Sequence, residues 1–443
     1  MRSDDDKRKV QGRRHEVWRG PLVFGYLLFA VFSFLLPSGV RAQEVLRLDE
    51  LIAVALKNSP DLLVSESKVS ASRYRIPQAK ALPDPMFMFG YQNEGFDRIT
   101  LGEEQGAQGM FTVSQMFPFP GKRGLKGDMA IKDAESIEAM HRATTLKIVA
   151  TVKQLYYDLF LAYKNIDILK KLTEYFSRVE DAATARYSSG MGSQQEVVMA
   201  QTEKYMLLEK EEMQRQKIDA IQGMLNSTIG RNVNIPLGRP AEPVSTPYSY
   251  GMEELLRIAR SNSPEIRSRE KMVEAAEAKV KMAKKEFYPD VTLGASYYPR
   301  TKDYMDMWNL TATINIPIFY KDKQEPAVQE ASANLLGAKR ELSATEYMLS
   351  SNIRENYSMA QAAERLMTIY KEGLIPKTYQ DFQLALSGYA TGKIEAITAI
   401  SRLKAVLDTE TLYWGQYIER EKAIARLEAI AGNTDSLSGV REK

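Results

Sequence analysis

Hydrophobic and polar side chains alternate strictly along residues 308–316. The apolar set is Trp308, Leu310, Ala312, Ile314 and Ile316, and the polar set is Asn309, Thr311, Thr313 and Asn315. Successive side chains of a strand point to opposite faces, so this period of two predicts a β-strand. Residues 291–297 alternate in the same way. We therefore expect a strand pair at about 290–316.

A second, less regular strand pair is predicted at about 86–116. Its first strand alternates Phe87, Phe89 and Tyr91 with Met86, Met88 and Gly90, and residues 111–114 alternate on the return strand. Alternation by itself fits a half-buried soluble sheet and a membrane sheet equally well. The strand lengths of about ten residues and the aromatic side chains near the strand ends favour the membrane.

On the membrane interpretation, one face of the strands contacts lipid and the other lines a pore. The expected lipid-facing residues are Phe87, Phe89, Trp308, Leu310 and Ile314, and the expected pore-facing residues are Asn309, Thr311, Thr313 and Asn315. A spanning helix needs roughly 20 apolar residues, and no such run follows residue 42. Four strands cannot close a barrel, for which about eight is the minimum, so several chains would have to contribute.

The long segments between the strand pairs have a helical period. No proline lies between Pro120 and Pro236, and apolar residues recur there by threes and fours, as in a helix packed like a coiled coil. The seam is Val149, Val152, Tyr156, Leu159, Tyr163, Ile166, Leu169, Leu172, Phe176 and Val179. A continuous helix over 122–187 would be roughly 100 Å long. Helical hairpins are expected at about 122–224 and 322–430, with an interruption at Pro376, which lacks an N–H group.

The chain is internally duplicated. The segment that begins at Asp49 recurs 204 positions later at Glu253, and Tyr187-Ser-Ser-Gly190 is matched by Tyr389-Ala-Thr-Gly392. A repeat of this length is too long for a solenoid and indicates two halves of one architecture. We expect a first repeat at 43–226, a linker at 227–249, a second repeat at 250–431 and a disordered tail at 432–443.

The first 42 residues have the pattern of a signal peptide. Basic residues precede an apolar run at 22–36, and Val40-Arg41-Ala42 provides small residues before the expected cleavage site. Cleavage would change the formal net charge from +3 to −1, which gives no electrostatic reason to bind nucleic acid. The absence of cysteine excludes disulfides and thiolate sites. His141 would be the one histidine left, and we expect it at the surface.

These features together resemble the TolC family of outer-membrane efflux proteins over nearly all of residues 45–431. The resemblance rests on the segment 48–60, on Phe117-Pro-Phe and Ile316-Pro317-Ile at the strand-to-helix junctions, and on the paired Tyr-x-x-Gly turns. It implies a mainly α protein with a membrane β-barrel contribution, in which three copies form a twelve-stranded barrel continued by a periplasmic α-barrel. It also implies a location in the outer membrane of a Gram-negative bacterium, extending into the periplasm.

The resemblance further implies partners at the helix-hairpin tips. A periplasmic adaptor, also called a membrane fusion protein, would dock there and connect the chain to an inner-membrane pump, which by this resemblance is of the RND type. The expected entrance residues are Gly190, Gly192, Ser193, Gly392, Lys393 and Glu395. Family members often carry a ring of carboxylates in this region, but Thr398 and Ser401 stand where acids are frequent. Glu395 is the one carboxylate left, and it fits a solvated tip residue at least as well as a gate.

We therefore expect a passive exit duct of a tripartite efflux or type I secretion system, with no cofactor and no catalytic role. The alternative is a periplasmic coiled-coil adaptor without its own pore. An enzyme is disfavoured because acid pairs such as Glu103-Glu104 and Glu211-Glu212 show no convergent pocket. The twenty methionines would suit a soft metal ion as cargo, although gap filling is their ordinary role.

Overall fold

A computed structural model describes residues 45–101, 103–247, 250–301 and 303–432. The expected signal peptide and residues 433–443 of the expected tail lie outside these ranges. The described residues form one compact unit. Its helices are α2 (Leu48–Asn58), α3 (Pro60–Lys80), α4 (Lys122–Ser188), α5 (Gln194–Thr228), α6 (Met252–Asn262), α7 (Pro264–Lys285), α8 (Gln324–Thr368), α9 (Ile375–Ala390) and α10 (Ala396–Ala431), and its strands are β1 (Met86–Gln92), β2 (Gln108–Phe117), β3 (Val291–Tyr298) and β4 (Met307–Ile314).

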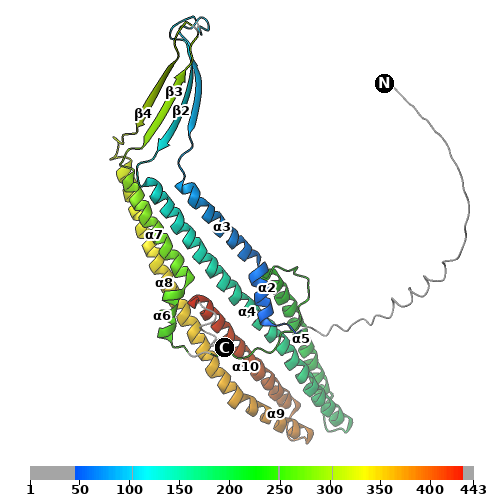
Figure 1. Cartoon of the computed structure of the whole chain (residues 1–443). Helices are drawn as coiled ribbons and strands as arrows, with labels where there is room; N and C mark the ends of the chain where they lie inside the picture. The colour runs from blue at the N-terminus through cyan, green and yellow to red at the C-terminus, as the bar shows by residue number, and fades with distance from the viewer. Residues whose placement is uncertain (1–44, 102, 248–249, 302, 433–443) are drawn as a thin grey trace, which may run out of the picture. The chain divides into compact units, whose positions relative to one another are not determined.

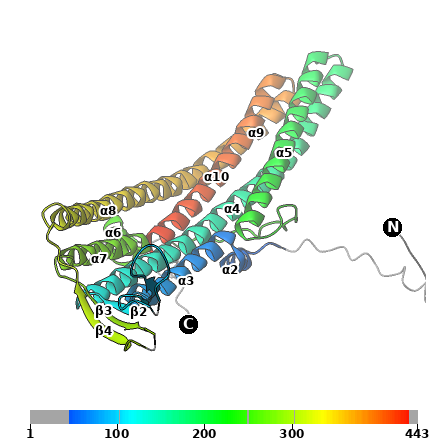
Figure 2. The same ribbon diagram turned by 90° about the horizontal axis from the view of Figure 1, so that it is seen from above.

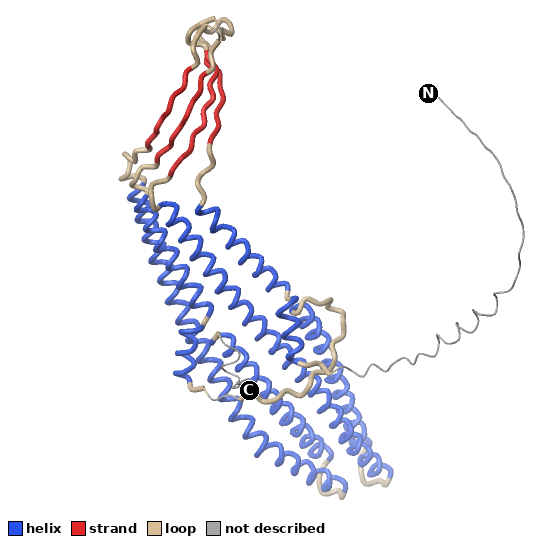
Figure 3. Tube along the Cα trace, in the orientation of Figure 1, coloured by secondary structure: helices blue, strands red, loops and turns tan. Residues whose placement is uncertain are grey.

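The order of elements repeats, so the structure contains the duplication that the sequence predicts. Each half has a helix pair, a strand pair, a long helix, a tight turn and a return helix (Figure 1). Pro60 and Pro264 stand at the first turn of α3 and α7, where the missing N–H group of proline has no helical partner to lose. Strands and helices are segregated, with all four strands beyond one end of the helices (Figure 3).

The four strands form one antiparallel sheet in the order β1-β2-β3-β4. The two strand pairs of the repeats are joined through β2 and β3, which leaves β1 and β4 as the edges. β4 ends at Ile314, two residues before the end of the alternating segment, because its partner strand β3 begins at Val291, which pairs with Ile314. Asn315 therefore lies beyond the strand, where its N–H group donates to the Asp290 carbonyl oxygen.

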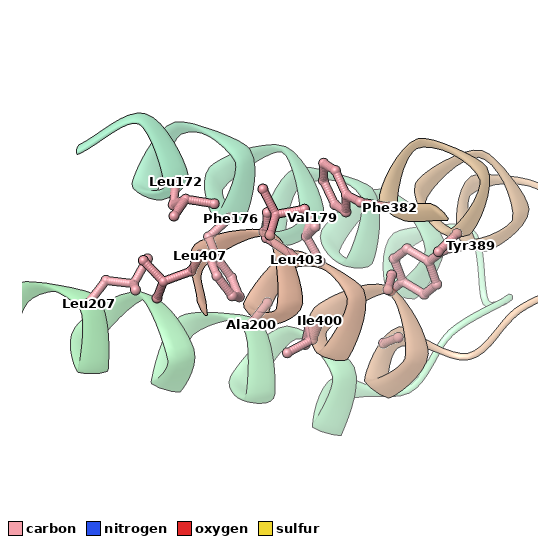
Figure 4. Packing of buried hydrophobic residues seen from close by; sticks show 14 of the residues in the cluster. Leu172, Phe176, Val179, Ala200, Leu207, Phe382, Tyr389, Ile400, Leu403 and Leu407 are labelled. Carbon is pink, nitrogen blue, oxygen red and sulfur yellow. The ribbon is translucent and has the colours of Figure 1, made fainter. Parts of the chain in front are cut away.

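α4 is a single helix of 67 residues, which at 1.5 Å per residue is about 100 Å long. The expected seam is buried except for Tyr163, which is half-buried. At the far end from the sheet, Phe176 and Val179 of α4 pack with Phe382 of α9 and Leu403 of α10 (Figure 4). This shared core fixes the two hairpins, α4 with α5 and α9 with α10, beside each other with their turns at the same end (Figures 1 and 2).

The expected interruption at Pro376 takes the form of a π-helical turn, Ile369–Leu374, between α8 and α9. Proline at position 376 cannot donate a backbone hydrogen bond, and a widened turn before it lets the helix continue. Pro376 thus stands in the first turn of α9 and alters the helix without ending it.

The return helices of the two repeats end in the same way. Gly230 after α5 and Gly432 after α10 both have positive φ angles, 73° and 81°. A Cβ atom at Gly230 would lie 2.2 Å from the Asn58 carbonyl oxygen, and one at Gly432 would lie 2.3 Å from the Asn262 carbonyl oxygen. Each glycine therefore lets the end of a return helix contact the end of the short first helix of its own repeat.

None of the described helices is both long enough and apolar enough to cross a membrane. His141 differs from expectation, since it is half-buried and its Nδ1 atom lies 2.9 Å from Ser65 Oγ. It contributes to the packing of α3 against α4.

Candidate functional site

The register of the sheet places the phenylalanine side chains of β1 and β2 and the alternating apolar side chains of β3 and β4 on one face. Phe89 pairs with Phe111, Phe111 with Tyr297, and Tyr297 with Trp308, so four aromatic side chains form a row across the sheet. Phe89 and Trp308 are 76% and 74% exposed. An uncovered apolar face that carries an aromatic row suits a membrane interface. The predicted lipid-facing residues all lie on this face: Phe87, Phe89, Trp308, Leu310 and Ile314.

The opposite face of the sheet is polar over β3 and β4. Thr112 Oγ1 and Ser296 Oγ are 2.8 Å apart across β2 and β3, and Asn309 donates to the Tyr298 hydroxyl at 3.2 Å. Of the predicted pore-facing residues, Asn309, Thr311 and Thr313 share this face. Asn315 does not belong to the strand, although it is exposed.

A buried lysine attaches the sheet to the helices. Lys122, the first residue of α4, has a side chain that is 3% exposed. Its ammonium group lies 2.9 Å from Asp290 Oδ1 and 3.2 Å from Glu286 Oε2, and it donates to the Tyr288 carbonyl oxygen. The Phe119 N–H group also donates to Asp290, at 2.8 Å. The junction from β2 to α4 and the junction from α7 to β3 are therefore held by one charge cluster, because a buried charge requires several partners.

The hairpin tips contain the predicted entrance residues. Gly190 and Gly392 occupy equivalent turns with φ angles of 73° and 74°. Ser193 and Glu395 directly precede α5 and α10, and neither side chain caps its helix. Gly190, Ser193, Gly392, Lys393 and Glu395 are exposed, and Gly192 is half-buried against Arg186.

The tips also contain a charged cluster that the sequence did not reveal. Arg186 of α4 donates to the Tyr389 carbonyl oxygen at 3.2 Å and to the Met191 carbonyl oxygen at 2.9 Å. Its guanidinium carbon lies 5.3 Å from the centroid of the Tyr389 ring. The Tyr389 hydroxyl donates to Glu196 Oε2 at 2.8 Å. These contacts connect the two hairpins at their ends.

The charged cluster constrains both Gly392 and Tyr389. A Cβ atom at position 392 would lie 2.9 Å from Arg186 Nη1. Any residue other than glycine would therefore displace the guanidinium group. Burial of the phenol, with the Glu196 carboxylate beside it, raises the pKa of Tyr389 to about 12, so the hydroxyl remains a donor at neutral pH. Tyr187, the equivalent residue in the first repeat, is 49% exposed, so the two tips are not alike.

A groove lies between the hairpins, further from the tips. It has a volume of about 530 Å³ and is lined by α4, α5 and α10. Asn165 Oδ1 and Gln214 Oε1 are buried in its walls without a hydrogen-bond partner. Leu169, Met213 and Leu412 supply apolar surface. Within the part of the chain that the structure describes, no three His, Cys, Asp or Glu side chains are placed to hold a metal ion.

The sequence matches the family described as outer membrane efflux protein over residues 51–231 and 255–433. Both repeats are covered, and the chain belongs to this family. It is 20% identical to the cobalt-zinc-cadmium resistance protein CzcC of Cupriavidus metallidurans, over 88% of this chain and 91% of that protein. It is 22% identical to the pyoverdine export outer membrane protein OpmQ of Pseudomonas putida, over 88% of this chain and 86% of that protein.

Solved structures have the same fold. The outer-membrane channel OprN superposes with a TM-score of 0.76 at 15% identity, over 87% of this chain and 90% of that one. The outer membrane protein VceC from Vibrio cholerae gives 0.74 at 18% identity, over 87% and 96%. The resemblance inferred from the sequence is thereby confirmed, and so are the fold class and the assignment to outer-membrane efflux. The adaptor alternative has no support from these comparisons.

Proposed function

We propose that three copies of this chain form one passive exit duct through the outer membrane. The observation that carries the proposal is the register of the sheet, which separates an uncovered apolar face from a polar one and leaves β1 and β4 as unpaired edges among the described residues. Edge strands expose backbone hydrogen-bonding groups that require partners. Pairing β4 of one copy with β1 of the next satisfies both edges and closes a ring of twelve strands.

A denaturing gel of outer membranes tests the shared barrel. Unboiled samples should migrate as a trimer and boiled samples as a single chain, because a closed barrel resists detergent until it is heated. Purified trimer should also conduct ions across a planar bilayer. A monomer recovered from the soluble periplasm would contradict the proposal.

The exposed tips form the docking surface for a periplasmic adaptor, which joins the duct to an inner-membrane pump of the RND type. Three features support this docking: the turns that contain Gly190 and Gly392 are exposed, they lie at the same end of the helices, and the groove further along the same hairpins carries amide oxygens without partners. The adaptor would supply the missing donors. CzcC is named for metal resistance and OpmQ for pyoverdine export, so cargo differs among relatives and the duct need not select it.

The absence of cysteine makes site-specific cross-linking direct. In cells that contain the adaptor and pump, Ser193→Cys should cross-link to the adaptor through a short bifunctional reagent. Ser332→Cys, an exposed position on α8 far along the chain from either tip, is the matched control and should not react with the adaptor. Equal cross-linking at both positions would remove the tips as the docking surface.

Glu395 provides a carboxylate at the entrance of the proposed duct. It is exposed and directly precedes α10, so it acts on passing ions through its charge. Glu395→Gln should lower the preference for cations in planar-bilayer measurements while leaving the trimer intact. An unchanged cation preference would show that this carboxylate has no role in permeation.

A further inference from the structure

The four strands contain no charged residue, so the charges nearest to the sheet lie at its two ends. Arg300 follows the last residue of β3 by two positions, at the end of the sheet that points away from the helices (Figure 1). The ladder between β2 and β3 continues toward it, because the Gly109 N–H group donates to the Pro299 carbonyl oxygen at 3.1 Å. One step further along this register, Arg300 stands opposite Gln108.

A row of polar side chains holds Arg300 on the polar face. Gln92 and Gln108 pair across β1 and β2, and both share the face of Thr112. Gln108 Nε2 donates to Gln92 Oε1 at 3.4 Å, and Arg300 Nε and Nη2 both donate to Gln108 Oε1 at 3.3 Å. Gln108 is only 9% exposed, so it is a fixed acceptor. The guanidinium group therefore lies on the polar face, beyond the last ladder pair of β2 and β3.

The charge of Arg300 is not neutralised by a neighbouring acid. Arg98, in the loop between β1 and β2, lies 2.9 Å from Glu103, whereas no carboxylate of the described residues is within 4 Å of the Arg300 guanidinium group. Asp306 accepts the backbone N–H group of Arg300 at 2.8 Å, but its other oxygen accepts the hydroxyl of Tyr297, which belongs to the aromatic row of the apolar face. The loop thus directs its arginine to the polar face and binds its aspartate to the apolar face.

We propose that Arg300 is a specificity-determining residue at the outer mouth of the duct, where three copies form a ring of guanidinium groups that favours small anions over cations. The inference rests on the proposed function, since the polar face must line the duct and three copies must close it. Rings of arginine or lysine side chains give pores a preference for anions. Here the ring lies at the opposite end of the chain from the exposed tip carboxylate of Glu395.

The dimensions of the proposed barrel allow such a ring to act. Twelve strands about 4.8 Å apart and tilted by about 40° give a diameter of roughly 24 Å, so each guanidinium group stands within about 12 Å of the axis. The Debye length is about 10 Å at 0.1 M salt and about 3 Å at 1 M. The field of the ring therefore reaches passing ions at about 0.1 M salt and is screened from them at about 1 M.

The permeability ratio of K⁺ to Cl⁻, measured from reversal potentials of the whole trimer in a planar bilayer, tests this role. Arg300→Gln should raise the ratio about threefold at about 0.1 M KCl and leave it unchanged at about 1 M, as expected for three screened unit charges about 12 Å from the axis. Arg300→Lys keeps the charge and should keep the ratio of the unchanged protein. A role of Arg300 only in fixing the loop predicts no dependence on charge or salt, so an equal ratio in Arg300→Gln and the unchanged protein would overturn the proposal.

Arg98→Gln is the matched control for the loss of one positive charge at the same end of the sheet. The Arg98 side chain is 67% exposed and paired with Glu103, so its removal should change the ratio much less than threefold. An equal effect of Arg98→Gln and Arg300→Gln would assign the ion preference to the total charge of the outer loops and contradict a specific role of Arg300.

A second variant keeps the test decisive if Arg300→Gln gives no heat-dissociable trimer. Gln108→Glu leaves Arg300 in place but sets a carboxylate against its guanidinium group, so it should raise the ratio in the same direction and with the same dependence on salt. No change in Gln108→Glu would then overturn the proposal. Absence of any current from the unchanged protein would contradict the duct itself, whereas a current with the same ion preference in all variants would contradict the role of Arg300 alone.

Discussion

At the scale of single residues, the most informative contacts lie at the hairpin tips. Arg186, Glu196 and Tyr389 come from three helices and contact one another through the carbonyl group, the hydroxyl and the ring of Tyr389. A hydrogen bond to a charged group contributes more than one between neutral groups. At the tips, the relative position of the two hairpins therefore depends on a few polar side chains in addition to the shared hydrophobic core.

Removal of the Tyr389 hydroxyl should loosen this connection. Tyr389→Phe keeps the buried ring but removes the hydroxyl that donates to Glu196, so we expect a loss of about 1 kcal/mol in the stability of the tip. Hydrogen exchange of the backbone amides on either side of the two turns measures the loss. Tyr187→Phe is the matched control, because Tyr187 is the equivalent residue of the first repeat and is half exposed. Equal effects of the two substitutions would show that the hydroxyl contact adds nothing.

The sequence pointed to the tip turns but not to their charged cluster. Tyr187 and Tyr389 belong to matching motifs, so duplication alone identified the turns. Arg186 and Glu196 have no counterpart in that pattern, and a charge near a helix end is ordinarily solvated. Their partner, Tyr389, lies about 200 residues away in the chain, and no local pattern contains a contact of that range.

At the scale of elements, the duplication is clearest where a return helix ends. Gly230 and Gly432 contact the carbonyl oxygens of Asn58 and Asn262, two asparagines that are equivalent in the repeats. The backbone conformation and the close approach both require the absence of a Cβ atom. The two helix ends are therefore constrained in the same way, although the sequences around them differ.

Gly230→Ala should destabilise the chain by about 2–3 kcal/mol, because alanine is strained at a positive φ angle and its Cβ would overlap the Asn58 carbonyl oxygen. Thermal unfolding of the detergent-solubilised protein measures the change. Gly223→Ala, within the preceding helix α5, is the control. Its added Cβ meets no atom within 4 Å, so it should stabilise by about 0.5–1 kcal/mol. A neutral result for Gly230→Ala would show that this end of the helix shifts freely.

The contact between the repeats, α4 against α7, contains a network of two lysines and two glutamates. Lys132 lies 2.9 Å from Glu274 and 3.2 Å from Glu135, and Lys271 lies 2.8 Å from Glu274 and 3.2 Å from Glu135. Hydrogen bonds from the two lysines lower the pKa of Glu274 below 4.5. At Glu135, burial raises the pKa of the carboxyl group. The hydrogen bonds and charges of the two lysines outweigh burial, so the pKa of Glu135 is also lowered. Hydrogen bonds from the glutamates raise both lysine pKa values above 10.5, with Glu274 as the largest cause.

These shifts define the pH range in which the network stabilises the fold. The carboxylates contribute above pH 4.5, and their contribution is lost as the pH falls through their lowered folded pKa values. The lysines contribute below pH 10.5 and lose their contribution as the pH rises through their raised values. The double variant Glu135→Gln, Glu274→Gln should therefore unfold at a lower temperature than the unchanged protein at pH 7, and this difference should shrink as the pH falls below 4.5. A difference that stays constant as the carboxyl groups of the folded protein titrate would exclude charge as its cause.

The elements themselves were predictable from the sequence because their periods are long and regular. The seam of α4 repeats over many turns, and the alternation at 308–316 locates β4 to within two residues at its end. The end of β4 was not predictable, because it depends on where β3 begins across the sheet. The π-helical turn was foreseen only as an interruption, since Pro376 removes a hydrogen bond without dictating what replaces it.

At the scale of the whole molecule, the sheet is the feature that makes sense only with further copies. Both of its faces are open at β4, every residue of which is exposed in the single chain. The order β2 beside β3, which joins the repeats into one sheet, could not be derived from the alternation of the separate strands. The family resemblance supplied the larger assembly, and the register gives that assembly a physical reason.

Arginine substitutions at two neighbouring positions of β4 test how the sheet is used. Leu310 and Thr311 are both exposed in the single chain but lie on opposite faces. In the proposed duct, Leu310→Arg places a charge in lipid, which costs about 2–4 kcal/mol near the middle of the bilayer, whereas Thr311→Arg places it in water. Leu310→Arg should therefore lower the yield of heat-dissociable trimer in outer membranes much more than Thr311→Arg. A sheet that worked in water as a single chain would tolerate both alike, and a sheet with its faces reversed would give the opposite order.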